Sequence, residues 1–235
     1  MATNRVNFFR IPRVRMQILH DSRNFFLPGP VGRLEAILWT PTRPGKPTLA
    51  AVLCHPHPMF GGTLHNKVIY QAAKSLDALG VPVLRFNFRG AGRSAGEHNG
   101  GLGERGDVQA AIDFLAAEFP DTPLLVGGFS FGSWVGLRVG CTDARVQEVI
   151  GLGIPVNSSD FGYLENCGKP KLIVQGTTDE YGSWEKVESV VARMAGGTRL
   201  FFVQGADHFF AGHLDQLDQA ITTWLTQRHP LLTKA

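Results

Sequence analysis

Apolar runs alternate with segments of helical periodicity from residue 48 to residue 227. The apolar runs are short and continuous, which is typical of strands that are covered on both faces of a sheet. They predict strands at residues 48–56, 81–90, 123–129, 146–154, 169–176 and 198–205. The spacing of apolar residues elsewhere predicts helices at residues 66–79, 103–119, 131–140, 183–194 and 212–227.

The N-terminal part of the chain follows a different pattern. It predicts two further strands at residues 14–20 and 34–40, separated by the turn-rich stretch FLPGPVG at residues 26–32. The strands that follow alternate with helices, which implies βαβ units. We therefore predict an α/β fold with a mostly parallel, twisted sheet of about eight strands, helices on both faces, and one domain over residues 1–235.

Ser130 lies in the pentapeptide GFSFG at residues 128–132, between a predicted strand and a predicted helix. In a G-x-S-x-G turn the serine takes a strained backbone conformation, and the flanking glycines prevent clashes. The hydroxyl then projects above the carboxyl edge of the sheet, where parallel sheets bind ligands. A chain with 28 glycines could contain this pentapeptide by chance, but the strand–turn–helix setting favours a nucleophile.

A serine hydroxyl needs a base to act as a nucleophile, and histidine is the usual one. Three of the eight histidines, His208, His213 and His229, follow Ser130 in the chain. His208 lies in the loop between the last predicted strand and the last predicted helix. His213 falls in or beside that helix and His229 lies past its end, so both are expected to be solvated. His208 is therefore the predicted base.

A carboxylate must orient this histidine, and three positions are candidates. Asp179 directly follows the penultimate predicted strand, at the edge of the sheet where Ser130 is expected. Glu180 is longer and points differently, while Asp207 is adjacent to His208, and adjacent side chains rarely orient each other. We predict a triad of Ser130, Asp179 and His208.

Acyl transfer also requires two backbone N–H groups aimed at the oxyanion that develops on the substrate. Phe131, the residue after the serine, is expected to supply one of them. The loop after the strand at residues 48–56 is expected to supply the other. Its prolines lack N–H groups, and of the remaining donors, His55, His57 and Met59, we predict His57 because it lies between the two prolines.

Two features could indicate a cofactor instead. The spacing His55-x-His57 is also found in zinc sites, but the other ligands would have to come from elsewhere in the chain. Gly90 and Gly92 imitate part of a dinucleotide-binding fingerprint, but a second glycine-rich loop follows them where that motif requires a helix. We therefore expect neither a metal nor another cofactor.

Two further segments carry a resemblance to a known family. FNFRGAGRSAG at residues 86–96 is similar to the R-G-x-G-x-S loop of α/β hydrolases, and the chain resembles that superfamily from about residue 13 to residue 228. The block HPHPMFGGT…HNK at residues 55–67 resembles small bacterial hydrolases related to dienelactone hydrolase-like and acyl-peptidase-like proteins. Pro56 departs from the H-G-x motif of many members, and the proline makes this loop stiffer.

The resemblance implies a serine hydrolase that needs no cofactor. The expected substrate is a small carboxylic ester, cleaved through an acyl-enzyme as by a carboxylesterase. A thioesterase or a peptidase with the same triad is an alternative. A non-catalytic binding protein on a hydrolase fold is another, although no triad residue is missing.

The segment between Ser130 and Asp179 leaves little room for a cap. Once a helix and two strands are placed there, only residues 155–169 remain, so we expect no separate cap domain. The active site is then shaped by loops. Core packing is expected for Trp134 and Phe210. The aromatic residues expected to contact the substrate are Phe60, Phe161, Tyr163, Trp184 and Phe209.

Composition excludes several other classes of protein. The chain is 43% hydrophobic and 18% charged, as in globular α/β proteins, and its net charge is +3. Basic residues are in excess over residues 1–46 but are spaced by apolar ones, so we expect a solvated strand face and no nucleic-acid binding. No apolar run approaches the length of a membrane span, so we expect no membrane binding either. No signal peptide is evident, which favours a cytoplasmic location. A monomer and a homodimer both remain open.

The three cysteines are scattered along the chain. Cys54, Cys141 and Cys167 are odd in number and have no zinc-ligand spacing, so no disulfide framework is predicted. Cys54 and Cys141 lie in apolar runs and are expected to be buried side chains.

Overall fold

An eight-stranded sheet forms the centre of the computed structural model, which describes residues 20–43 and 45–232. The strand order is β1-β2-β4-β3-β5-β6-β7-β8, with antiparallel pairing of β1 with β2 and of β2 with β4, and parallel pairing elsewhere. The strands are β1 (His20–Gly29), β2 (Gly32–Pro41), β3 (Ala50–Cys54), β4 (Val83–Phe86), β5 (Leu124–Phe129), β6 (Val146–Leu152), β7 (Lys171–Gly176) and β8 (Thr198–Val203). The predicted fold class is confirmed.

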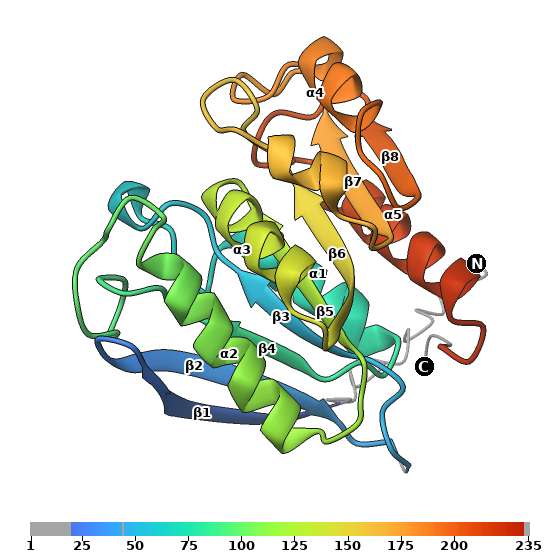
Figure 1. Cartoon of the computed structure of the whole chain (residues 1–235). Coiled ribbons are helices and arrows are strands. Elements are labelled where there is room, and N and C mark those ends of the chain that lie inside the picture. Colours follow the sequence, from blue (N-terminus) through green and yellow to red (C-terminus); the bar gives the residue numbers. More distant parts are fainter. Residues whose placement is uncertain (1–19, 44, 233–235) are drawn as a thin grey trace, which may run out of the picture.

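Helices cover both faces of this sheet (Figure 1). On one face lie α2 (Glu104–Glu118) and α3 (Phe131–Thr142), and on the other lie α1 (Lys67–Ala78) and α5 (Leu214–Arg228). The short helix α4 (Trp184–Val191) packs against β7 and β8. Within residues 20–43 and 45–232, no helix combines the length and the apolar character needed to cross a membrane.

Two hydrophobic cores, one on each face, explain the continuous apolar runs of the central strands. In β3, Ala50, Val52 and Cys54 pack into the core beneath α2 and α3. Ala51 and Leu53 pack into the core beneath α1 and α5. Because successive side chains of a strand point to opposite faces, a strand covered on both sides must be apolar at every position.

The N-terminal prediction was wrong over residues 21–29, whereas the predicted turn is present at residues 30–31. Instead of a turn-rich connection, β1 runs from His20 to Gly29 and pairs along its length with β2. Pro28 is tolerated there because β1 is an edge strand, where a missing N–H need not break a ladder. The predicted strand at residues 14–20 lies outside the described residues except for His20.

The other predicted strands and helices are present with shifted ends. The strand predicted at residues 81–90 ends at Phe86 because its neighbour β3 ends opposite it, at Cys54. Between β6 and β7 only a short 3₁₀ turn, η2 (Gly162–Asn166), is inserted. The expectation that no cap domain interrupts the fold at this point is confirmed.

A disulfide joins Cys141 to Cys167, contrary to the sequence-based expectation. It links the end of α3 to the loop before β7, across a Cα–Cα distance of 5.5 Å. The side chain of Lys169 reaches the same helix end and donates to the carbonyl oxygens of Gly140 and Asp143. Scattered cysteines carry no pairing signal in a sequence, since the fold alone brings them together. Cys54 is a buried free cysteine, as expected.

Loss of this disulfide is expected to destabilise the protein. The bond closes a loop over a sequence separation of 26 residues, and such bonds typically stabilise by about 2–4 kcal/mol. Urea unfolding of oxidised wild type and of Cys141→Ser would measure the difference. Wild type under reducing conditions serves as the control and should match the variant. Equal stability of the oxidised and reduced wild type would contradict the prediction.

Candidate active site

Ser130 occupies a strained turn between the end of β5 and the start of α3. Its backbone has φ 54° and ψ −123°, a conformation that residues with a side chain rarely adopt. The Ser130 N–H donates to Leu152 O at 3.0 Å, and its carbonyl accepts hydrogen bonds from the N–H groups of Ser133 and Trp134. These bonds hold the strained residue at the carboxyl edge of the sheet.

The two glycines of the motif make this turn possible. A Cβ atom on Gly128 would lie 2.3 Å from the carbonyl oxygen of Gly132, and one on Gly132 would lie 2.2 Å from the carbonyl oxygen of Cys54. Both distances are far below van der Waals contact, and both clashes are with backbone atoms. The steric role predicted for these glycines is therefore confirmed.

The three side chains of the predicted triad meet at this edge. His208 Nε2 lies 2.9 Å from Ser130 Oγ, and His208 Nδ1 lies 2.8 Å from Asp179 Oδ2. His208 and Asp179 are both buried. Neither alternative carboxylate is bonded to His208: Glu180 is exposed, and Asp207 accepts a hydrogen bond from the N–H of Ala211.

Asp179 is held by hydrogen bonds on both of its oxygens. Oδ1 accepts from the N–H groups of Tyr181 and Gly182 at 2.8 and 3.2 Å. Oδ2 accepts from Gln175 Nε2 at 2.7 Å in addition to His208. Gln175, which is the last residue but one of β7 and is fully buried, was not singled out from the sequence. These bonds set the orientation of the carboxylate, and through it that of the imidazole.

The loop after β3 brings His57 to Phe131. Their rings have a centroid separation of 4.8 Å. His57 O accepts the N–H groups of Phe60 and Gly62, which folds the loop back on itself. Within the described residues, neither the His57 N–H nor the Phe131 N–H has a hydrogen-bond acceptor. Both predicted oxyanion donors are therefore available to a ligand.

The neighbouring His55 is held in the fold by hydrogen bonds on both nitrogens of its ring. Its Nδ1 donates to Pro56 O at 2.6 Å and its Nε2 accepts the Phe88 N–H at 3.0 Å, which ties the end of β3 to the end of β4. Burial lowers the pKa of His55 to about 4, so the ring is neutral. A metal at His55 would have to displace these bonds, and among residues 20–43 and 45–232 no group of three or more potential ligand side chains is arranged to hold a metal ion.

His98 packs against both predicted oxyanion donors. Its ring centroid lies 4.6 Å from that of His57 and 5.4 Å from that of Phe131. His98 Nδ1 lies 2.7 Å from Glu104 Oε1, which is within ion-pair distance but poorly aligned for a hydrogen bond. Burial and the neighbouring His98 lower the pKa of His57, while Glu104 opposes this shift. Sequence reasoning missed His98 and Glu104, because only the fold brings their loop to the site.

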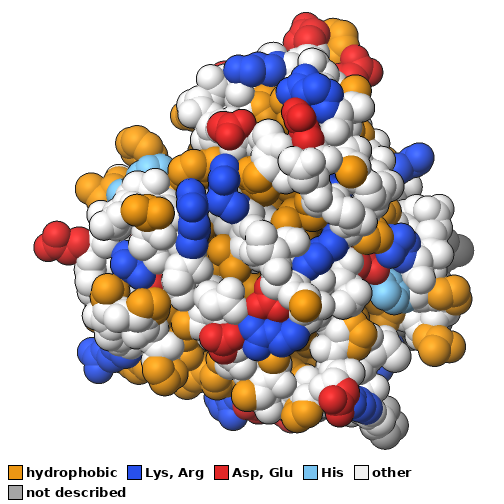
Figure 2. Space-filling model, in the orientation of Figure 1, with side chains coloured by type: hydrophobic (Ala, Val, Ile, Leu, Met, Phe, Trp, Pro, Cys, Tyr) orange, Lys and Arg blue, Asp and Glu red, His pale blue; other side chains and the backbone are white. Residues whose placement is uncertain are grey.

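A cavity of about 200 Å³ opens at Ser130. Phe60 and Phe209, two of the residues expected to contact the substrate, line it together with His57 and His208. Figure 2 shows apolar atoms beside a histidine at the edge where the turn η1 (Pro58–Phe60) lies. The other residues that line the cavity are Pro56, Gly61, Gly62, Asn66, Ser130 and Tyr181.

Three of the five aromatic residues expected to contact substrate do not line this cavity. Phe161 is buried in the core, and Tyr163 donates its hydroxyl to Trp134 O at 3.0 Å, because η2 folds back onto α3. Trp184 lies at the start of α4 and packs against Phe202 of β8. Position on a loop near the site was too weak a criterion for these three residues.

Tyr181 lines the cavity at Ser130 but was not predicted from the sequence to contact the substrate. Its ring centroid lies 4.5 Å from that of His208, and nearly half of the side chain is exposed. It lies two residues after Asp179 on the same loop. This short separation from a predicted triad residue was the signal in the sequence that could have identified Tyr181 as a site residue.

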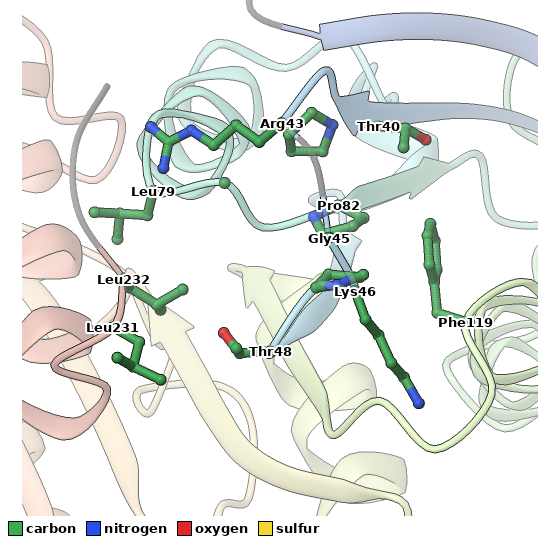
Figure 3. A pocket seen from close by; sticks show the side chains of 13 residues that line it. Thr40, Arg43, Gly45, Lys46, Thr48, Leu79, Pro82, Phe119, Leu231 and Leu232 are labelled. Atoms are coloured by element: carbon green, nitrogen blue, oxygen red, sulfur yellow. The ribbon is translucent and has the colours of Figure 1, made fainter.

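Another cavity, of about 300 Å³, shares no lining residue with the cavity at Ser130. Figure 3 shows the side chains that line it. This cavity lies among the end of β2, the segment before β3 and the residues after α5, and its lining includes Arg43, Lys46 and Leu232. Arg43 donates to Ala78 O at the end of α1, and Lys46 Nζ lies 3.6 Å from Asp121 Oδ2. No predicted site residue lines this cavity.

The chain matches known proteins over most of its length. A family profile for an α/β hydrolase domain matches residues 51–224. An uncharacterized protein of Rickettsia prowazekii (strain Madrid E), RP471, is 35% identical over 206 residues, which cover 84% of this chain and 86% of that protein. The chain therefore belongs to the α/β hydrolase family.

Solved structures of α/β serine hydrolases are also similar to this chain. An α/β serine hydrolase homologue from Coxiella burnetii has a TM-score of 0.81 and 35% identity, over 86% of this chain and 97% of that one. XC6422 from Xanthomonas campestris, an α/β serine hydrolase without a lid, has a TM-score of 0.82 and 32% identity, over 89% of this chain and 96% of that one. This chain shares the lidless architecture.

Gly132→Ala is expected to destabilise the fold. A Cβ atom 2.2 Å from a carbonyl oxygen forces the start of α3 away from β3, and overpacking of this kind costs roughly 1–3 kcal/mol. Gly168→Ala is the matched control, because a Cβ there meets no atom within 4 Å. Urea unfolding should show a loss of stability for Gly132→Ala and almost none for Gly168→Ala. Equal losses would refute the steric explanation.

The stability of the protein is expected to fall as the pH drops from 6.5 towards 4. The pKa of His55 is about 4 in the folded protein and 6.5 by reference, so the unfolded chain binds a proton first over this range. The stabilisation is complete above pH 6.5, and roughly 3 kcal/mol is lost by pH 4. Unfolding at pH 7.5 and pH 5 should show a smaller difference for His55→Gln than for wild type. His65→Gln, at an exposed histidine, is the control. If the stability difference between pH 7.5 and pH 5 is the same in His55→Gln as in wild type, His55 is excluded as its cause.

Proposed function

We propose that this hydrolase cleaves small carboxylic esters through a covalent acyl-enzyme. The observation that carries the proposal is the continuous line from Ser130 Oγ to His208 Nε2, at 2.9 Å, and from His208 Nδ1 to Asp179 Oδ2, at 2.8 Å. A hydroxyl, an imidazole and a carboxylate in this order form a nucleophile, its base and the group that orients the base.

The first half of the reaction acylates the serine. Ser130 Oγ attacks the ester carbonyl carbon while His208 Nε2 takes the hydroxyl proton, and Asp179 accepts a hydrogen bond from the Nδ1–H of the same ring. The carbonyl oxygen becomes an oxyanion, to which the N–H groups of His57 and Phe131 donate. The C–O bond then breaks, and the departing alcohol takes the proton from His208.

The second half releases the acid. Water attacks the acyl carbon while His208 accepts one of its protons, and the same two N–H groups stabilise the oxyanion. The bond to Ser130 Oγ then breaks and the serine recovers its proton from His208. Every proton is carried by groups of this chain, so the proposed reaction requires no cofactor.

The surroundings of Ser130 support a small ester as substrate. The cavity of about 200 Å³ is walled by the rings of Phe60, Tyr181 and Phe209, which suit an apolar group of modest size. With no cap over the site, the ester has direct access from solvent. The binding partner proposed for this site is therefore a small molecule.

Ser130→Ala is expected to lower kcat for p-nitrophenyl acetate by a factor of at least about 1000, and Asp179→Asn by a comparable factor. A fluorophosphonate should add to Ser130 of the wild type, as mapped by peptide mass spectrometry. Ser158→Ala, at an exposed serine, is the control and should keep both labelling and turnover. Ester turnover that survives Ser130→Ala would refute the proposal. An adduct without ester turnover would favour thioester or amide substrates.

A further inference from the structure

A groove of about 630 Å³ adjoins the cavity at Ser130. The two share Gly61, Asn66 and Phe209, so the groove continues the cavity away from the serine. Its walls are the loop that leads into α1 and the loop that leads into α5, which includes Gly212. A substrate whose carbonyl lies at Ser130 could extend into this space.

The groove differs in charge from the cavity. Lys67 is the one residue of its lining with a full charge at neutral pH, and no carboxylate lines it. Within the described part of the chain, Lys67 has no ion-pair partner, and its side chain is exposed. The lining also contains His65, whose imidazole is exposed. The groove is therefore positive, whereas the walls of the cavity nearest the serine are mainly apolar and aromatic.

Asn66 supplies further hydrogen-bond donors where the two spaces join. Its Oδ1 accepts the N–H groups of Val68 and Ile69 at 2.9 and 3.4 Å, as the cap of α1. This assigns the oxygen of the amide, so that Nδ2 is the donor on the other side. Among residues 20–43 and 45–232, no acceptor pairs with Nδ2. An anionic ligand would satisfy these donors.

Lys67 is an unfavourable residue for the stability of its own helix. It is the first residue of α1, and the first turn contains no acidic side chain. The N-terminal end of a helix carries a partial positive charge, which favours acids and disfavours a lysine. Helix stability therefore does not explain a lysine at this position.

We propose that the substrate carries an anionic group, such as a carboxylate, at the end remote from the ester, and that Lys67 and Asn66 bind it in this groove. This inference rests on the proposed ester hydrolysis and defines its substrate class. The apolar middle of such a substrate would pass Phe209, which lines both spaces.

The test compares two esters with the same acyl chain length, mono-p-nitrophenyl adipate and p-nitrophenyl hexanoate. Wild type should have the higher kcat/KM for the charged ester relative to the uncharged one. In Lys67→Gln this ratio should fall two- to fivefold, which is the scale of an exposed charge pair. The ratio for wild type should also fall in 1 M salt, where charges are screened.

Lys74→Gln is the matched control. Lys74 is exposed on the same helix, two turns further along, and it does not line the groove. Its substitution should leave the ratio at the wild-type value. Lys67→Gln should unfold in urea at the same or a higher concentration than wild type, which a structural role for Lys67 would not allow.

A second pair of esters places the charge on the alcohol side. These are the acetate ester of 4-hydroxybutanoate and butyl acetate. Their hydrolysis is measured by the release of acid. The pair that shows the preference identifies the half of the substrate that occupies the groove. Hydrolysis of all four esters with no charge preference in either pair would overturn the subsite alone. So would a preference in one pair whose ratio is the same in Lys67→Gln as in wild type. Absence of any ester hydrolysis would overturn the proposed function and this inference with it.

Discussion

The close approach of β3, β5 and the start of α3 is the constraint on which the candidate site depends. Helix α3 begins directly at the end of β5, and Gly128 and Gly132 are the residues that allow it, because neither position has room for a Cβ atom. Ser130 between them takes a positive φ that hydrogen bonds to β6 and to its own helix hold in place. Its hydroxyl therefore stands at the edge of the sheet, beside the Phe131 N–H.

The other parts of the site come from loops that the sheet brings to the same edge. A line of hydrogen bonds runs from Gln175 near the end of β7 through Asp179 and His208 to Ser130. Each buried polar group along it has partners, which gives the arrangement one orientation. In the groove that adjoins the cavity, Lys67 stands at the start of α1, where it is unfavourable for the helix. The proposed anion subsite would accept this cost in stability for binding.

The sequence-based errors share a physical origin. Residues 26–29 contain turn-forming residues, yet an edge position in the sheet tolerates Pro28, so the segment joins β1. Cys141 and Cys167 meet because α3 ends beside the loop that precedes β7. Phe161 was assigned to the site from its place on a loop, whereas that loop packs into the core. Each outcome depends on contacts between distant segments, which local patterns do not contain.

Local sequence patterns were enough to predict the order of strands and helices after residue 48, the class of fold, and the three positions that meet as serine, carboxylate and histidine. Periodicity and the G-x-S-x-G turn are local, and parallel strands necessarily end at a common edge. Local patterns could not predict which aromatic rings wall the cavity, how His98 reaches the loop after β3 or which cysteines pair. Those features arise from the way loops pack against one another, and packing is a property of the folded chain as a whole.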